Sequence, residues 1–555
     1  MKKILICLLS IFMILSTFPF YASAVTGKPI STADEFMAMD PTGEYYLAAN
    51  ITLSRTYLKN FTGTLHGEGK TLTISEPIFE DFSGKVENLT IEGKVVKTDE
   101  DASAFALTSS KGFEALNCTN NANVTVMGYA KYASGFVGTC YNAAVKFTNC
   151  TNNGAIYLDS TADEKPRAGG FGAVIDTVIM NGCINNGNVY LNGNIGIAGG
   201  LVARVAQNAG EHTLNIYNSV NNGNVTVEDT YIAKDGTLGT GAADAGGIIG
   251  HIGIKDNTAD YQIWGCQNNG NIDAPHRVGG FVGYCYGIKA SAFIDMQFCI
   301  NTGDVTYGRI KKPDGKEYYD YGSAFVGYTN SAFTTIKYCI DTGNVKEREN
   351  SVCDFDFNIF VGLSSADASE YDVQSVYMLH KDQYEYFSYN GHELFSSVAN
   401  TYLIEPYEGI IPTTPDDLSS GKVAYAINQA AKDDKYTSAF KKGFAFYQKI
   451  GEDAIPSVDS SRGWVVLSGD TYTNGEPKAE PPETTKAPET TSASLTTQIS
   501  ETTASPSVTT SPEAEPPVQS GCTGFSCQAL LILIICAACL WRKWTVISGQ
   551  KNATI

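Results

Sequence analysis

A cysteine followed by two amide side chains recurs along the chain, and these residue types could bind a metal, form a nucleophilic site or serve as scaffold. The copy CINNGNV begins at Cys183, and CINTGDV begins at Cys299. The spacing between copies fits no zinc pattern, and no C-x-x-C occurs outside the C-terminal apolar segment. We therefore expect a structural seam of small, inward-facing side chains, either as free thiols or as disulfides between repeats. The equivalent positions are Cys118, Cys150, Cys183, Ser219, Cys266, Cys299 and Cys339.

Other candidate chemical motifs are incomplete. The stretch HGEGKT (His66–Thr71) ends like a phosphate-binding loop, but Thr64 stands where that loop requires its first glycine. The six histidines include no H-E-x-x-H pair, and the chain contains no G-x-S-x-G. We read His251 and His276 as packed or solvated residues beside glycine-rich strands. The sequence therefore predicts no catalytic residue, no metal site and no cofactor.

The recurring cysteine marks an internal repeat with steps of 32 to 47 residues. A second element keeps the same phase, as in GGIIG (Gly246–Gly250) and GGFVG (Gly279–Gly283). Each unit holds an apolar run, an alternating run that ends at the cysteine, an Asn/Gly turn and a short alternating strand. Three short strands per repeat predict one coil of a right-handed parallel β-helix, so the expected fold class is all-β.

The Asn and Gly residues after each cysteine have a structural interpretation. Both types tolerate positive φ, which a tight corner between two sheets requires. Amide side chains that stack from coil to coil can also form a hydrogen-bonded ladder. We expect both features at this corner.

The repeat, together with the alternating stretch before it, resembles β-helical surface proteins of Gram-positive bacteria that carry GLUG-type repeats. The resemblance lies in Asn50–Leu53, Phe61–Leu72, Val86–Gly93 and the seven later units. Ser419–Val466 is similar to the terminal segment of such arrays, a short amphipathic helix followed by a strand. The resemblance implies an exported β-solenoid of the adhesin-like class.

The two ends of the chain predict its location. Lys2 and Lys3, an apolar run and Ala22-Ser23-Ala24 are typical of a cleaved signal peptide. A Thr/Pro/Ser/Glu-rich stretch is too poor in apolar residues to fold, which suits a disordered stalk. The apolar segment that follows it, with Arg542 and Lys543 behind, predicts a single-pass anchor with the body extracellular.

The expected domains follow from these features. They are a signal peptide (1–24), an N-terminal cap with the first coils (25–95), parallel β-helix repeats (96–395), a C-terminal cap segment with one amphipathic helix (396–470), the stalk (471–520), the transmembrane anchor (525–544) and a short cytoplasmic tail (545–555).

We expect a non-enzymatic, surface-displayed protein that binds a glycan, matrix or a neighbouring cell surface. A formal charge of −20 excludes nucleic acid as a partner. Insertions between repeats often form loops that bind a ligand. Tyrosines beside polar groups are suited to contact sugar rings or a protein surface. The candidate ligand-binding residues are Lys316, Tyr318, Tyr319, Asp320, Tyr321, Tyr384, Tyr386 and Tyr389.

Two alternatives stay open. The chain could be a structural spacer without a specific ligand, or a polysaccharide lyase or glycosidase on a β-helix scaffold. Carboxylates for the second would come from Asp99–Asp101 or Glu317–Tyr321.

Overall fold

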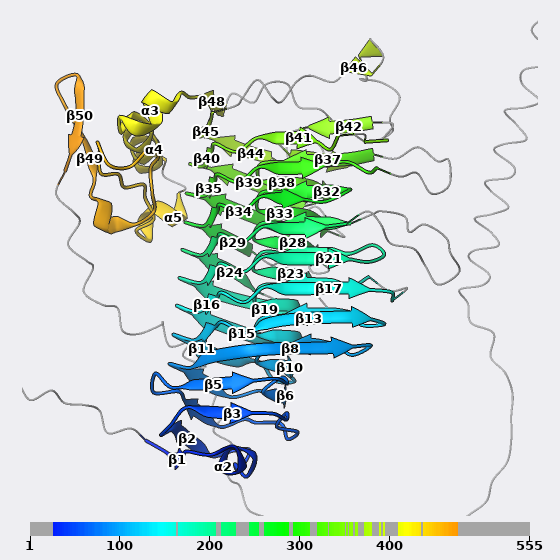
Figure 1. Ribbon diagram of the computed structural model, residues 1–555. Coiled ribbons are helices and arrows are strands. Elements are labelled where there is room, and N and C mark those ends of the chain that lie inside the picture. The colour runs from blue at the N-terminus through cyan, green and yellow to red at the C-terminus, as the bar shows by residue number, and fades with distance from the viewer. Residues whose placement is uncertain are drawn as a thin grey trace, which may run out of the picture. The chain divides into compact units, whose positions relative to one another are not determined.

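The chain folds as a parallel β-helix, followed by a small module of helices and a hairpin on one flank (Figure 1). The computed structural model describes residues 26–475 except 163–164, 207–212, 229–242, 255–259, 288–291, 311–318, 331, 350, 353–354, 359–360, 365–370, 380–387, 390–391, 394–408 and 435–436. The fold class expected from the repeat is confirmed. No helix among these residues is long and apolar enough to cross a membrane. The predicted signal peptide, anchor and tail lie outside them, as does the predicted stalk from residue 476 onward, whereas its first residues, Thr471–Asn474, form the strand β50.

One central coil shows how the sequence forms the fold. It runs through β27 (Asp244–Gly246), β28 (Ile249–Ile254), β29 (Asp260–Trp264), β30 (Gln267–Asn268) and β31 (Ile272–Asp273). Each strand pairs in parallel with its equivalents in the coils before and after. The coil therefore has five strand segments rather than the three expected. A bend at Gly246-Gly247 divides the apolar run into two strands, and the two residues that follow the cysteine, Gln267 and Asn268, form a short strand of their own.

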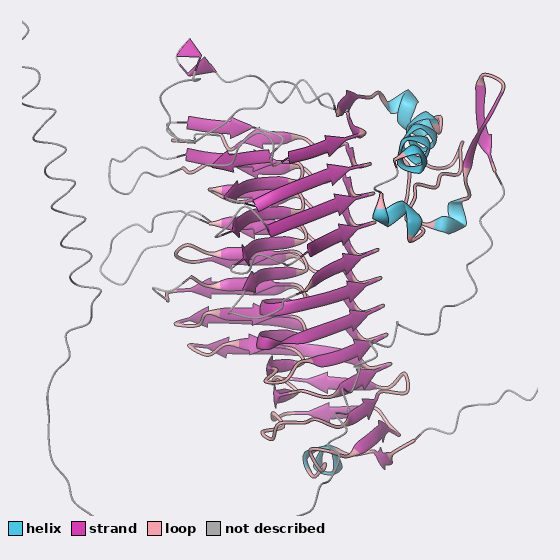
Figure 2. Ribbon diagram, turned by 180° about the vertical axis from the view of Figure 1, so that it is seen from behind, coloured by secondary structure: helices cyan, strands magenta, loops and turns pink. Residues whose placement is uncertain are grey.

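Equivalent strands stack into columns, which Figure 2 shows from behind. The column of β27 contains β9 (Ala102–Ser103), β14 (Tyr132–Ser134), β18 (Arg167–Gly169), β22 (Ile197–Gly199), β32 (Arg277–Gly279), β37 (Tyr319–Ser323) and β42 (Phe355–Asn358). The column of β28 contains β6 (Phe79–Asp81), β10 (Ala106–Thr108), β15 (Val137–Thr148), β19 (Gly172–Asn181), β23 (Val202–Ala206), β33 (Val282–Gly287), β38 (Val326–Asn330) and β43 (Val361–Ser364).

Three further columns complete the coils. The column of β29 contains β1 (Lys28–Ile30), β2 (Glu44–Leu47), β4 (Thr64–His66), β7 (Lys85–Glu87), β11 (Phe113–Leu116), the second halves of β15 and β19, β24 (Leu214–Tyr217), β34 (Ala292–Gln297), β39 (Ala332–Lys337) and β44 (Tyr371–Gln374). That of β30 contains β3 (Ile51–Leu53), β5 (Thr71–Ile74), β8 (Thr90–Thr98), β12 (Thr119–Asn120), β16 (Thr151–Asn152), β20 (Ile184–Asn185), β25 (Val220–Asn221), β35 (Ile300–Asn301), β40 (Ile340–Asp341), β45 (Val376–Met378) and β48 (Ile410–Pro412). That of β31 contains β13 (Asn123–Gly128), β17 (Ile156–Ser160), β21 (Val189–Asn192), β26 (Val225–Val227), β36 (Val305–Tyr307) and β41 (Val345–Glu347).

The interior is apolar and continuous from the first coil to the last. Short helix α2 (Ala33–Met37), with a capping box from Thr32 and Glu35, places Phe36 against the aromatic rings of the first coils. Further along, the seven seam positions, Ser219 included, are at most 1% exposed. The eight cysteines within the described residues carry free thiols.

The predicted amide ladder is confirmed, and it is buried. The first Asn after each seam residue donates its Nδ2 to the Oδ1 of the equivalent residue in the next coil, at 2.7 to 2.9 Å. Each Nδ2 of these Asn residues also donates to the carbonyl oxygen two residues ahead. The ladder therefore satisfies buried amides both within a coil and between coils. Its members are Asn120, Asn152, Asn185, Asn221, Asn268, Asn301 and, at the end, Asp341.

We expected Gly at this corner because it tolerates positive φ, and that explanation is wrong. Positive φ occurs at the residue immediately before each seam position, for example at Asn218 (48°) and Gly265 (63°). The Gly of the Asn-Asn-Gly turn has no positive φ; instead, a Cβ on Gly270 would lie 2.0 Å from the carbonyl oxygen of Gly223. Glycine is required there because consecutive coils approach too closely for a side chain.

The C-terminal module packs on the flank of the last coils. Helix α3 (Pro415–Ser419), helix α4 (Lys422–Asp433), helix α5 (Ser438–Lys441), the 3-10 helix η3 (Ser460–Arg462) and a hairpin of β49 (Val465–Ser468) and β50 (Thr471–Asn474) form it. Helix α4 is the expected amphipathic helix, and the two shorter α-helices were not expected.

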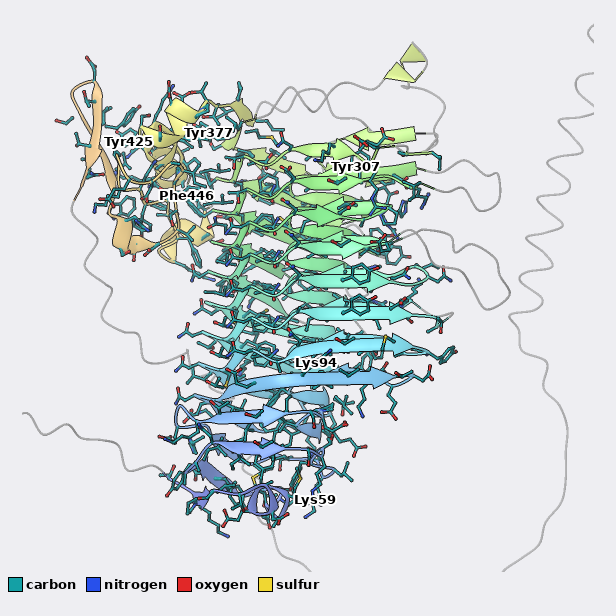
Figure 3. All side chains as sticks on the ribbon, viewed as in Figure 1. Lys59, Lys94, Tyr307, Tyr377, Tyr425 and Phe446 are labelled. Atoms are coloured by element: carbon teal, nitrogen blue, oxygen red, sulfur yellow. The ribbon has the colours of Figure 1, made fainter. Side chains whose placement is uncertain are left out.

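The module buries an apolar face against the corner row of the β-helix. In Figure 3, Phe446 and Tyr377 lie where the two parts meet. Its buried residues form one cluster with side chains of the β-helix, namely Trp264, Phe298, Ile300, Tyr338 and Ile340. At the corner, Phe298 (φ 54°) and Tyr338 (φ 57°) replace the Asn or Gly of earlier coils.

Candidate functional site

The most chemically varied face of the β-helix lies where the column of β27 turns into the column of β28. Parallel pairing places Arg204, His251, Tyr284 and Tyr328 in one row, on consecutive coils. The row of Asp244 and Arg277 runs beside it on β27 and β32. Alternation along β28 places Ile252 in the core, so His251 and Gly253 share the opposite, outward face.

Asp244 holds His251 in a fixed tautomer. The Nδ1 of His251 lies 2.9 Å from Oδ2 of Asp244, whose side chain is 1% exposed. Because a carboxylate only accepts hydrogen bonds, Nδ1 carries the proton and donates it. Burial lowers the pKa of His251, although the hydrogen bond to Asp244 opposes the shift. At neutral pH the imidazole is therefore neutral, and its Nε2 is an acceptor.

Arg277 compensates the charge of Asp244 and supports an aromatic ring. Its Nε lies 2.6 Å from Oδ1 of Asp244, and its guanidinium carbon lies 3.7 Å from the centroid of the Tyr284 ring. The Tyr284 ring in turn meets His251 edge-to-face, with ring centroids 4.7 Å apart. Asp244, His251, Arg277 and Tyr284 thus form one packed unit, which fixes the position of the imidazole.

Two polar atoms converge above a bare glycine. Among the described residues, the atoms nearest to a Cβ on Gly253 would be the backbone oxygen of Val205 at 3.8 Å, and Nη2 of Arg204 and Nε2 of His251 at 3.9 Å each. Tyr286 pairs with Gly253 on the next coil and is 40% exposed. We call Arg204, His251, Gly253, Tyr284 and Tyr286 the Arg204–Tyr286 site.

Arg204 forms no ion pair with a described residue, in contrast to Arg277 and Arg309. Arg277 pairs with Asp244, and Arg309 pairs with Asp320. The Nε of Arg204 is buried and has no hydrogen-bond partner among the described residues. The atom of Arg204 that lies beside the open position at Gly253 is Nη2, and this is the donor that a ligand could reach.

Two of the ligand-binding candidates predicted from sequence, Asp320 and Tyr321, lie next to this site and are buried. Asp320 is fully buried: its Oδ1 lies 3.0 Å from Nδ1 of His276, and its Oδ2 accepts the backbone N–H of Arg309 at 2.9 Å. Tyr321 is 8% exposed, with its ring 4.5 Å from that of Tyr328. Neither side chain projects from a loop, because β37 incorporates both into the coil.

The remaining candidates are placed only in part. Tyr319 lies in β37 and Tyr389 in β46 (Ser388–Tyr389), which pairs with β47 (His392–Glu393). Lys316, Tyr318, Tyr384 and Tyr386 lie outside the described residues.

The seam thiols are poorly suited to nucleophilic chemistry. Burial raises the pKa of Cys183 to about 12, and burial also holds the pKa of Cys266 well above its usual value. A thiol in this state is almost entirely protonated at neutral pH. Within the described ranges, no group of three or more His, Cys, Asp or Glu side chains is placed to hold a metal ion.

The pairing of Asp244 with His251 was missed from the sequence, although a signal exists. The residue two positions before each Gly-Gly pair occupies one row, and in successive coils it is Arg167, Ile197, Asp244 and Arg277. Aligning that position across the repeats would have placed Asp244 beside Arg277. The contact with His251 depends on the bend at Gly246-Gly247, which no spacing rule predicts.

No family model matches the chain, and no curated protein matches it. One similar solved structure is a putative immunoglobulin A1 protease from Bacteroides ovatus, with 13% identity and a TM-score of 0.31, covering 59% of this chain and 85% of that one. Another is an IgA1 protease, with 16% identity and a TM-score of 0.31, covering 53% of this chain and 20% of that one.

Proposed function

We propose that this chain is an adhesin-like β-helix protein, displayed on the cell surface, that binds glycans without modifying them. The observation that supports the proposal is the Arg204–Tyr286 site. It combines an exposed aromatic ring, a bare glycine floor and two convergent polar atoms. Sugar rings stack on aromatic faces, while a few fixed donors and acceptors select their hydroxyl groups.

The scaffold suits binding because it is rigid. The site lies on strands whose backbone is paired on both sides, and the ladder of buried amides fixes the register of the coils. A preorganised site loses less conformational entropy when a ligand binds. In this proposal, the predicted signal peptide, stalk and anchor present the site away from the membrane.

Glycan-array binding by the full-length chain in detergent micelles tests the proposal. We expect binding to at least one glycan class, and we expect Tyr286→Ala to weaken it by about tenfold, as the loss of a central aromatic contact would. Tyr157→Ala is the matched control, because Tyr157 is an exposed tyrosine (36%) on β17, outside the site. An array without binding, or equal losses in both variants, would contradict the proposal.

The Asp244–His251 pair favours a second candidate function, a polysaccharide-active enzyme. A carboxylate that orients a neutral histidine leaves Nε2 able to take a proton from a substrate. A lyase would leave an unsaturated sugar at each new chain end, which an increase in ultraviolet absorbance detects. A hydrolase would release reducing ends, which a reducing-sugar assay detects. Product release by the unmodified chain that is abolished in His251→Gln would establish this function and replace simple binding.

A further inference from the structure

We infer that the Arg204–Tyr286 site selects a terminal sugar that carries one carboxylate, such as a sialic or uronic acid, over neutral sugars and polyanionic chains. This inference rests on the proposed function and names the ligand class of the same site.

Arg204 is the residue that favours an anionic ligand. Its Nη2 lies 3.9 Å from the position that a Cβ on Gly253 would take, and, unlike Arg277 and Arg309, Arg204 has no carboxylate partner among the described residues. A carboxylate is the acceptor that matches a guanidinium in shape and charge, and it can take two parallel hydrogen bonds.

His251 favours a ligand with a hydroxyl group, such as a sugar, over a simple acid. With Nδ1 donating to Asp244, Nε2 can only accept, so it excludes a second carboxylate and favours a hydroxyl group. Nη2 of Arg204 and Nε2 of His251 flank the same bare position at 3.9 Å each. A ring that bears a carboxylate and a nearby hydroxyl satisfies both atoms, and the exposed Tyr286 ring offers it a stacking face.

The charge of the whole chain limits the ligand to a single acid. The formal net charge is −20, so a long polyanion meets repulsion beyond the site itself. A single carboxylate at the end of a neutral glycan contacts Arg204 while the remainder of the ligand carries no charge to be repelled.

Calorimetry or array titration of the full-length chain with four probes tests the inference. The probes are sialyllactose, a glucuronate-terminated oligosaccharide, lactose and polygalacturonate. We expect one of the two singly acidic probes to bind at least tenfold more tightly than lactose and polygalacturonate, and the comparison of these two identifies the acid. Arg204→Gln should reduce that binding to the lactose level, and Arg204→Lys should retain part of it. Lys146→Gln, which removes an exposed cation on β15 that pairs with Glu114, should have no effect.

A steric variant provides a second test. Gly253 has no positive φ and has room for a Cβ, so Gly253→Val should fold normally while its side chain occupies the binding position. We expect it to abolish binding of the acidic probe without a change in the thermal midpoint. Equal affinity for lactose and the acidic probes, or binding insensitive to Arg204→Gln, would overturn the inference and leave the proposed function standing. Tightest binding of polygalacturonate would also overturn it, and no binding to any glycan would overturn both.

Discussion

Asn221 and Asn222 are adjacent in the chain, yet they extend two amide ladders of opposite direction. Asn221 donates its Nδ2 to Oδ1 of Asn268 in the following coil at 2.9 Å, whereas Asn222 donates to Oδ1 of Asn186 in the preceding coil at 2.7 Å. The first ladder is buried and the second is exposed. The two residues therefore make the same kind of bond in different solvent environments, and each can serve as the control for the other.

Removing Asn221 should cost far more stability than removing Asn222. Asn221→Ala deletes a buried bond to Asn268 and deprives the Asn185 amide of its inter-coil partner, at a cost of about 2–3 kcal/mol. In Asn222→Ala, water replaces the lost partners, so the expected cost is under about 1 kcal/mol. Denaturant unfolding of both variants measures the difference, and equal losses would contradict a role for burial.

Gly270→Ala should destabilise the β-helix, while Gly253→Ala should be tolerated. A Cβ at Gly270 would lie 2.0 Å from a backbone oxygen of the preceding coil, which only a separation of the coils can relieve. At Gly253 the nearest atom in the described part of the chain would be the Val205 backbone oxygen, 3.8 Å away. We expect a loss of at least about 2 kcal/mol for the first variant and under about 0.5 kcal/mol for the second. Thermal unfolding followed by circular dichroism distinguishes them, and a stable Gly270→Ala would disprove the close-approach explanation.

The fold was largely predictable from the sequence, and the site was not. The repeats of Cys183 and its equivalents reveal the coil because each coil places the same residue types in the same environment. The role of Gly270 was misassigned because positive φ and close backbone approach select the same residue. The site escaped prediction because Arg204, His251 and Tyr286 come from three coils, and only the register of β23, β28 and β33 brings them together. Asp320 and Tyr321 were expected on a projecting loop, but β37 begins at Tyr319 and takes both into the wall.

Phe298→Asn should release the C-terminal module without unfolding the β-helix. Phe298 is fully buried. Its ring stacks with those of Tyr338 and Phe440 and meets that of Phe446 edge-to-face. Asn relieves the backbone strain of a positive φ, worth about 1 kcal/mol, but loses about 3 kcal/mol or more of aromatic burial. Hydrogen exchange should therefore rise in α4 and α5 while the strands stay protected. Unchanged exchange in α4 would show that the module does not depend on this contact.

Alkylation should distinguish native from unfolded thiols. The nine cysteines from Cys118 to Cys353 should all react in denaturant if no disulfide forms. In the native chain, burial raises the pKa of Cys140 and of Cys183 to about 12, so both should resist iodoacetamide at pH 7 for hours. Mass spectrometry after pulse labelling measures this, and rapid native labelling of Cys183 would contradict its place in the interior.

Stability should fall as the pH drops below the ordinary histidine range, and His251 should account for part of that fall. Its folded-state pKa lies below the usual 6.5 because burial disfavours the charged ring, while the unfolded chain titrates normally. The unfolded state therefore binds a proton that the folded state does not. Folding stability is fully present above about pH 6.5 and is lost as the pH falls through the lowered folded-state pKa.

The groups that face His251 determine the size of this effect. Asp244 favours the protonated ring, whereas Arg204 and Arg277 oppose it, and the Tyr284 ring covers one edge. His251→Gln keeps a polar side chain but cannot titrate, so its unfolding free energy should change less between pH 7 and pH 5 than that of the unmodified chain. Carboxylates with lowered pKa, such as Asp417, act at still lower pH and are common to both proteins. Parallel pH profiles for the two would show that His251 remains equally protonated in the folded and unfolded states. Acid should also weaken glycan binding, since a protonated Nε2 can no longer accept a hydrogen bond from a sugar hydroxyl.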